Sequence, residues 1–178
     1  MPRSSSSSQY RIKNLTHSTV AVRDIAAGEE LTVTYVDAML PRAQRQARLR
    51  DWGFNCTCAH CAAGEAEGAE SDARLRRIAE LEKKLDDFTD LSVTAETGAE
   101  LVALYQAEQL DIYLGHVYTR AALNFALLGD TERASEYAAF AVVAVEREFG
   151  PEVGDIESMR MLAEDPQNHW TWGRSRYG

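Results

Sequence analysis

The first third of the chain alternates apolar and polar residues, a pattern typical of β-strands, whose successive side chains point to opposite faces. It predicts a short strand over residues 20–23 and a second strand over residues 30–36, separated by a turn at residues 26–29. One face of the second strand would carry Leu31, Val33 and Tyr35. Residues 1–9 precede this pattern, are rich in serine, and are predicted to be disordered.

Helical spacing replaces the alternation from Pro41 onward. Proline suits the first turn of a helix, where its missing N–H costs nothing, so a basic helix is predicted over residues 42–52, ending at Gly53. Residues 62–71 are small and acidic, which favours a linker. The helix after the linker has apolar residues at helical spacing, namely Leu75, Ile78, Leu81, Leu85 and Phe88.

Ser71 or Asp72 would cap the N-terminus of the helix that contains Leu75. Three further helices are predicted after that helix. A loop at residues 89–97 precedes them, and they cover residues 101–114, 118–128 and 131–149. The last two resemble a single tetratricopeptide repeat, because small residues that allow close helix packing fall in register: Ala121, Ala122, Ala134, Ala138 and Ala141. Any alanine-rich helical hairpin would give a similar pattern, so both interpretations stay open.

Together these elements predict an α+β chain of unequal parts. A small strand-bearing unit covers residues 10–61, a linker covers residues 62–71, and an all-α helical region covers residues 72–178. A chain of 178 residues has room for one domain or for two small domains that share an interface.

Charge and hydropathy exclude several classes of function. The net charge of −9 argues against general binding of nucleic acid. No apolar run approaches the roughly 20 residues that span a bilayer, and the serine-rich start does not read as a secretory signal. Residues 91–178 hold six Arg or Lys against fourteen Asp or Glu. This acidic half would attract a basic partner such as a histone tail, or it is a solvated helical surface.

Cys56, Cys58 and Cys61 are the chain's three cysteines, and all lie within six residues. This spacing does not suit a secreted disulfide framework, so we expect a reducing compartment, the nucleus or the cytoplasm. Thiolates at this spacing can converge on one Zn²⁺, which normally takes four ligands. The fourth ligand is missing from the sequence. The alternatives are a knot that binds zinc only with a partner's help and a knot that binds none.

Residues 23–61 resemble the C-terminal part of a SET domain, the fold of many protein-lysine methyltransferases, with its post-SET cysteines. The resemblance rests on the sequence Gly28-Glu29-Glu30-Leu31 followed by Tyr35, and on the cysteine cluster that comes after a helix. It is closest to the SET-and-MYND-type branch and its fungal relatives, in which a helical, repeat-like region follows the post-SET cysteines. The fold class is therefore expected to be a small SET remnant with a cysteine knot, followed by helices.

The resemblance also implies roles for individual residues. Tyr35 matches the catalytic tyrosine, whose ring lines the lysine channel and whose hydroxyl orients the amine. Phe54 matches an aromatic residue that can close over S-adenosylmethionine or over the substrate channel, although beside Trp52 it could equally belong to a core. Cys56, Cys58 and Cys61 match the post-SET zinc ligands, and the substrate would be a histone or another lysine-containing protein.

The cofactor-binding motifs of the family have no counterpart in this sequence. The family binds S-adenosylmethionine through a glycine-containing N-terminal segment and an Asn-His-Ser-Cys motif that also supplies the fourth zinc ligand, and neither occurs here. We therefore expect an N-terminally truncated SET-domain protein that is inactive as written. The competing interpretation is a non-catalytic interaction module in which the helical pair at residues 118–149 does the binding. Neither the substrate nor the oligomeric state follows from the sequence.

Overall fold

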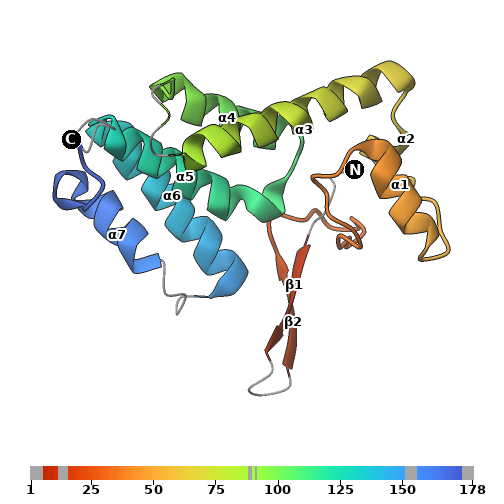
Figure 1. Cartoon of the computed structure of the whole chain (residues 1–178). Helices are drawn as coiled ribbons and strands as arrows, with labels where there is room; N and C mark the ends of the chain where they lie inside the picture. Colours follow the sequence, from red (N-terminus) through yellow and green to blue (C-terminus); the bar gives the residue numbers. More distant parts are fainter. Residues whose placement is uncertain (1–5, 12–15, 88–89, 91, 151–155, 174–178) are drawn as a thin grey trace.

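The computed structural model describes residues 6–11, 16–87, 90, 92–150 and 156–173 (Figure 1). Within these ranges the strands are β1 (Ser6–Arg11) and β2 (Thr16–Ala21), which pair antiparallel with Ser6 opposite Ala21. The α-helices are α1 (Arg42–Arg50), α2 (Ala59–Ala62), α3 (Glu65–Asp86), α4 (Ala95–Ala107), α5 (Leu114–Leu127), α6 (Thr131–Phe149) and α7 (Ile156–Glu164). Two 3-10 helices are η2 (Asp111–Tyr113) and η3 (Pro166–Asn168). The described chain is thus mostly helical with little β-structure, as the sequence predicts.

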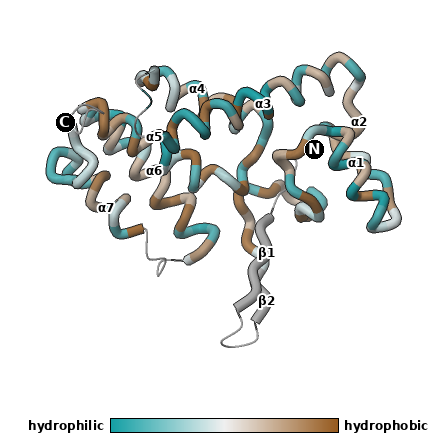
Figure 2. Tube along the Cα trace, viewed as in Figure 1, coloured by the Kyte–Doolittle hydropathy of each residue, from teal (hydrophilic) through white to brown (hydrophobic). Residues whose placement is uncertain are grey.

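The hydrophobic core lies among α3 to α7, whose apolar residues recur at helical spacing. Its largest fully buried apolar side chains include Phe125, Ile78, Leu81, Leu101 and Leu162. Hydrophobic segments in α5 and α6 and in the loop before α1 are visible in Figure 2, but several of the loop residues are exposed. No helix in the described ranges combines the length and apolar content that crossing a membrane requires.

Helices α5 and α6 form a closely packed hairpin. The chain reverses at Gly129, which has a φ of 76° that suits glycine. Asp130 then caps α6 by accepting a hydrogen bond from the backbone N–H of Arg133 at 3.1 Å. The two helices approach closely because the residues between them are small and fully buried: Ala121, Ala122, Ala134, Ala138 and Ala141. The predicted helical pair is confirmed in its elements, whereas its assignment as a tetratricopeptide repeat stays a prediction.

Figure 1 shows α3 running from this bundle to the part of the molecule that holds α1 and α2. The β-hairpin projects from the bundle, and β2 contacts α6. The predicted turn at residues 26–29 is present, since the Glu29 N–H donates to the Ala26 carbonyl at 3.0 Å and Gly28 has a φ of 83°. This turn leads the chain toward α1.

The strand predictions are wrong in their positions. Residues 30–36 form no strand, although they are rich in β-branched residues, because the described sheet contains β1 and β2 alone and a strand needs a neighbouring strand to pair with. The earlier strand covers Thr16–Ala21 rather than residues 20–23. Part of the serine-rich start, predicted to be disordered, forms β1 through pairing with β2, while residues 1–5 lie outside the described residues.

The predicted linker over residues 62–71 is helical from Glu65 onward. Alanine and glutamate are good helix formers, and Gly68 serves packing, because an added Cβ there would lie 2.9 Å from Nη1 of Arg42. Asp72 caps a different helix from the one predicted, since its Oδ1 accepts the N–H of Arg42 in α1 at 2.9 Å. Residues 65–71 are therefore the first part of α3 rather than a linker. Phe88, at the end of the predicted helix, lies outside the described residues.

The predicted helix over residues 101–114 is two helices. Helix α4 starts earlier, at Ala95, where Thr94 and Thr97 form a capping box within the predicted loop. It ends at Ala107 with Glu108 as its C-cap, and Gln109 takes a positive φ of 52° before η2 begins. The apolar spacing continues through this break, so periodicity alone could not locate it.

Candidate functional site

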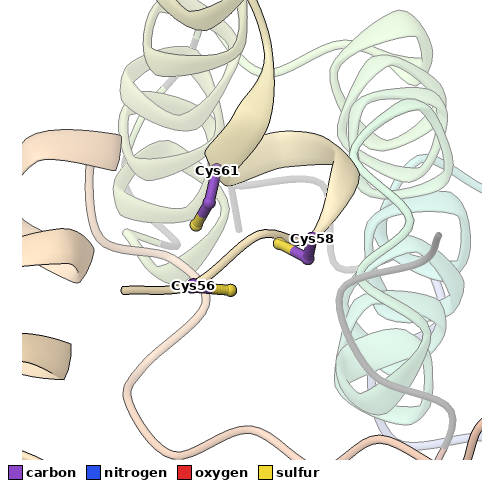
Figure 3. A group of neighbouring side chains, drawn as sticks. All are labelled: Cys56, Cys58 and Cys61. Carbon is purple, nitrogen blue, oxygen red and sulfur yellow. The ribbon is translucent and has the colours of Figure 1, made fainter. Parts of the chain in front are cut away.

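The three cysteines lie on one short segment, residues 56–61, which we call the cysteine turn. Cys56 follows α1 in irregular chain, Cys58 is the N-cap of α2, and Cys61 lies within α2. The turn closes where the Cys61 N–H donates to the Cys58 carbonyl at 3.0 Å. All three sulfur atoms lie within 4.8 Å of one another, and Figure 3 shows them pointing toward a common space. The structure thus brings together the thiols that the sequence singles out.

The thiols differ in their tendency to ionise. Cys61 is buried, while Cys56 and Cys58 are half-buried. Burial raises the pKa of Cys56 to about 12. Burial also disfavours the Cys58 thiolate, but hydrogen bonds from the Cys61 backbone and from the two neighbouring thiols outweigh it and hold the pKa of Cys58 below its ordinary value. Cys58 is therefore the thiol of this pair that ionises more readily.

The donor set suits a soft metal ion in three of four positions. Sulfur ligands in a tight group are typical of structural zinc, which completes a tetrahedron with a fourth ligand. His60 lies inside the turn, but its ring faces α4: Nε2 lies 3.4 Å from Oε1 of Gln109, and Nδ1 lies 3.8 Å from Oε2 of Glu108. Among the described residues, the cluster that could hold a metal consists of the three cysteines.

Tyr35 lies beside two aromatic residues from the end of α1. Its ring centroid is 5.7 Å from that of Trp52 and 5.6 Å from that of Phe54, both in edge-to-face geometry. Gly53, with a φ of 83°, turns the chain between them. The exposed fractions of Tyr35, Trp52 and Phe54 are 56%, 64% and 40%, so this aromatic group is a surface feature and not a core.

One cavity joins the aromatic group to the cysteine turn. It is lined by residues 33–36, by Arg45 and Leu49 of α1, by Phe54, and by all three cysteines. Its volume of about 80 Å³ holds a few water molecules at most. A larger hollow of about 340 Å³ adjoins it, and Tyr35, Phe54, Cys56 and Cys58 border both. The tyrosine and the thiols, predicted from separate motifs, therefore share one surface.

Arg45 is a residue of this site that sequence reasoning missed. It lies on the predicted basic helix, is 5% exposed, and its Nη1 donates to the carbonyls of Ala38 and Leu40. Nη2 is buried and has no hydrogen-bond partner among the described residues. Arg45 thus fixes the loop that follows Tyr35. The sequence signal that could have found it is its spacing of four from buried Leu49.

Glu108 is the second missed residue. It is fully buried, its Oε1 accepts from Nε of Arg74 at 2.6 Å, and its Oε2 accepts from the Ser71 hydroxyl at 2.7 Å. These contacts connect the end of α4 to α3. Since Glu108 also faces His60, it lies next to the cysteine turn.

Comparison with known proteins finds several lysine methyltransferases. Histone-lysine N-methyltransferase ATXR2 of Arabidopsis thaliana is 48% identical over 42 residues, which are 24% of this chain and 9% of that protein. Histone-lysine N-methyltransferase set5 of Schizosaccharomyces pombe is 28% identical over 155 residues, 84% of this chain and 48% of that protein. N-lysine methyltransferase SMYD2-B of Danio rerio is 35% identical over 69 residues, 38% of this chain and 16% of that protein. No protein-family model matches the chain.

These relatives are SET-domain lysine methyltransferases, so the predicted relationship to that family is confirmed. The match to the Schizosaccharomyces pombe protein covers enough of this chain that it must include part of the helical region. The chain spans about half the length of that relative and a smaller share of the other two.

Proposed function

We propose that residues 10–61 of this relative of the SET-domain lysine methyltransferases are the C-terminal part of a SET domain with a post-SET zinc site. One observation carries the proposal: Tyr35 borders the same surface as Phe54 and the three cysteines, although it comes from a separate segment of the chain. An unrelated tyrosine and an unrelated cysteine cluster would not require this convergence.

In this proposal Cys56, Cys58 and Cys61 hold Zn²⁺, and water or another protein group supplies the fourth ligand. Bound zinc would fix the cysteine turn, because ligation by three thiolates restrains the segment that carries them. The cysteine turn would also support Phe54, which precedes Cys56 by two residues. The metal's role here is structural, and it takes no part in chemistry.

Tyr35 would form a wall of the channel that admits a lysine side chain. Its ring excludes water, and its hydroxyl would orient the neutral amine by a hydrogen bond. The aromatic neighbours Trp52 and Phe54 hold the ring through edge contacts. These are the contributions that this chain's own residues would make to methyl transfer.

S-adenosylmethionine, when bound to such a domain, supplies the reactive methyl group. The described residues do not fit it well, since the cavity beside the thiols holds about 80 Å³, and both it and the adjoining hollow are partly open to solvent. Holding the donor in line with the amine accounts for about 7–11 kcal/mol of the barrier. We therefore propose that the chain as given does not methylate lysine by itself.

The test is to purify the chain without chelator and measure zinc by elemental analysis. S-adenosylmethionine is then titrated by calorimetry, and transfer of a labelled methyl group to histone peptides is assayed with Tyr35→Phe as the control. We expect bound zinc, no donor binding and no transfer. A zinc content near zero with three freely titratable thiols would overturn the metal site, and transfer that is lost in Tyr35→Phe would overturn the inactivity.

A second candidate function is binding of a basic protein segment by the helical region. A hollow of about 420 Å³ lies between η2, α5 and α6, bordered by Tyr118, Phe140, Val143 and Asp111. Phe140 and Val143 are 44% and 57% exposed, which is unusual for large apolar residues placed side by side on a helix. Such a partner would be a histone or another lysine-rich protein, encountered in the nucleus or the cytoplasm.

A further inference from the structure

The buried carboxylate of Glu108 stands where a helix normally disfavours it. Glu108 is the C-cap of α4, and a negative charge at a helix C-terminus opposes the helix dipole. Among residues whose side chains are described, it is the one acidic side chain that is buried, at 0% exposure. Burial of a charge is unfavourable unless it is paired and hydrogen-bonded. A residue so placed needs a reason beyond the stability of α4.

Two residues of α3 donate hydrogen bonds to the Glu108 carboxylate. Ser71 and Arg74 donate to its two oxygens at 2.7 and 2.6 Å, which are short distances for charge-assisted hydrogen bonds. The Arg74 side chain is 33% exposed and reaches the carboxylate from the protein surface. This arrangement fixes both oxygens and leaves the carboxylate edge facing α2.

The group on that side is His60, which lies between Cys58 and Cys61. Its Nδ1 is 3.8 Å from the same oxygen that accepts from Ser71, and its Nε2 is 3.4 Å from Oε1 of Gln109. Gln109 is held in a left-handed conformation, with a φ of 52°, directly after Glu108. Both ring nitrogens of His60 therefore face one turn at the end of α4.

We infer that Glu108 is a positioning residue for the cysteine turn and acts on it through His60. Because His60 belongs to α2 between Cys58 and Cys61, contacts that hold its ring at the end of α4 also restrain the backbone that carries those two thiols. The helical region would then contribute to metal affinity without supplying a ligand. This inference rests on the proposed zinc site, but the positioning of the thiols can be measured without metal.

Two readouts on the full chain test it. The first is zinc affinity, measured by competition with a chromogenic chelator. The second is the alkylation rate of each cysteine by iodoacetamide in metal-free protein, followed by mass spectrometry. The variant is Glu108→Gln, which keeps an acceptor for Ser71. The matched control is Glu82→Gln, which removes a carboxylate that joins Tyr105 and Arg120 across α3, α4 and α5.

We expect Glu108→Gln to weaken zinc binding about tenfold, as loss of a residue that orients a ligand commonly does. Alkylation of buried Cys61 should become about tenfold faster, because a less ordered cysteine turn exposes this thiol more often. Glu82→Gln should change neither quantity. His60→Ala should reproduce both effects, and the double variant should show no more than either single change, since the two residues act through one contact.

Wild-type zinc affinity and wild-type alkylation of Cys61 in Glu108→Gln would overturn the inference, as would additive effects in the double variant. If the wild-type chain binds no zinc, the proposed metal site fails, and the alkylation rates alone decide the role of Glu108. If Glu108→Gln does not fold by circular dichroism, His60→Ala decides by the same two readouts, because it removes the group through which Glu108 acts.

Discussion

Two buried side chains show how single residues fix the loops of this molecule. Arg45 holds the carbonyls of Ala38 and Leu40, and so orders the chain between Tyr35 and α1. His169, which is 4% exposed, holds the segment after η3. Its Nδ1 accepts the N–H of Thr171 at 3.4 Å, and its Nε2 lies 2.9 Å from the Ser158 hydroxyl of α7. In both loops, side-chain hydrogen bonds from Arg45 or His169 hold a segment that has no helix or strand of its own.

Replacing Arg45 should therefore destabilise the loop beside the candidate site. Arg45→Met keeps the aliphatic volume but leaves two carbonyls without their donor, and we expect a loss of about 1–3 kcal/mol in the free energy of unfolding. Arg48→Met, on the exposed side of the same helix, is the control and should change little. Urea denaturation followed by tryptophan fluorescence measures both. Equal stabilities for the two variants would contradict the role of Arg45.

His169 should make the stability of the chain depend on pH near neutrality. Burial lowers the pKa of His169 below its ordinary value. The unfolded chain then binds the proton more readily than the folded chain, so this stabilisation is complete above a pH of about 6.5 and is lost as the pH falls toward the lower folded pKa. Thermal melts at a pH of about 7.5 and of about 5.5 should show a drop in Tm.

The drop should become smaller in His169→Gln, because glutamine does not titrate in this range. His116→Gln, which changes an exposed histidine of α5, is the control and should keep the wild-type pH dependence. If His169→Gln and wild type lose the same Tm between the two pH values, another group is responsible.

At the scale of elements, α6 is the helix whose ends the sequence defines most sharply. The predicted range of residues 131–149 is confirmed. Gly129 permits the turn, Asp130 caps the first turn, and Gly150 ends the helix with a φ of 87°. All three signals are local, so they can be recognised from neighbouring residues alone.

Removing this cap should weaken α6 by a predictable amount. Asp130→Ala deletes the acceptor for the Arg133 N–H, and we expect a loss of about 1 kcal/mol in the free energy of unfolding. Glu132→Ala removes a nearby exposed carboxylate that makes no cap and should have a smaller effect. Chemical denaturation of both variants and wild type gives the comparison, and equal losses would show that charge rather than capping matters here.

The sequence pattern could not predict elements whose structure depends on residues far away in the chain. Residues 30–36 have strand propensity, but propensity forms a strand only where another strand lies alongside. The contact of Gly68 in α3 with Arg42 of α1 is likewise not visible in the local pattern of residues 62–71. The same holds for the site: the motifs identified Tyr35 and the three cysteines, but not that they share a surface. Glu108 carries no local signal, because its partners are Arg74 and His60.

For the whole molecule, the core and the candidate site occupy different parts. The buried apolar cluster contains Ala38 from the first third of the chain, and its other members all lie between Leu75 and Leu162. The candidate site is built from loops, the short α2 and one face of α1. The helical region therefore holds most of the apolar area whose burial stabilises the chain, and the first third depends on it through α3 and the contacts of Glu108.

This division predicts that the helical region folds alone. A fragment starting at Gly64 keeps the whole of α3 and nearly all of the core cluster, so it should be helical by circular dichroism and melt cooperatively. A fragment starting at Asp72 loses the first turns of α3 and should melt at a lower temperature. Between residues 19 and 63, where side chains are described, few apolar side chains are buried, so a fragment of residues 1–63 should show no cooperative transition. A largely unfolded fragment from Gly64 would contradict this, and would show that the packing of α1 and of Val22 against the helices is needed to hold them together.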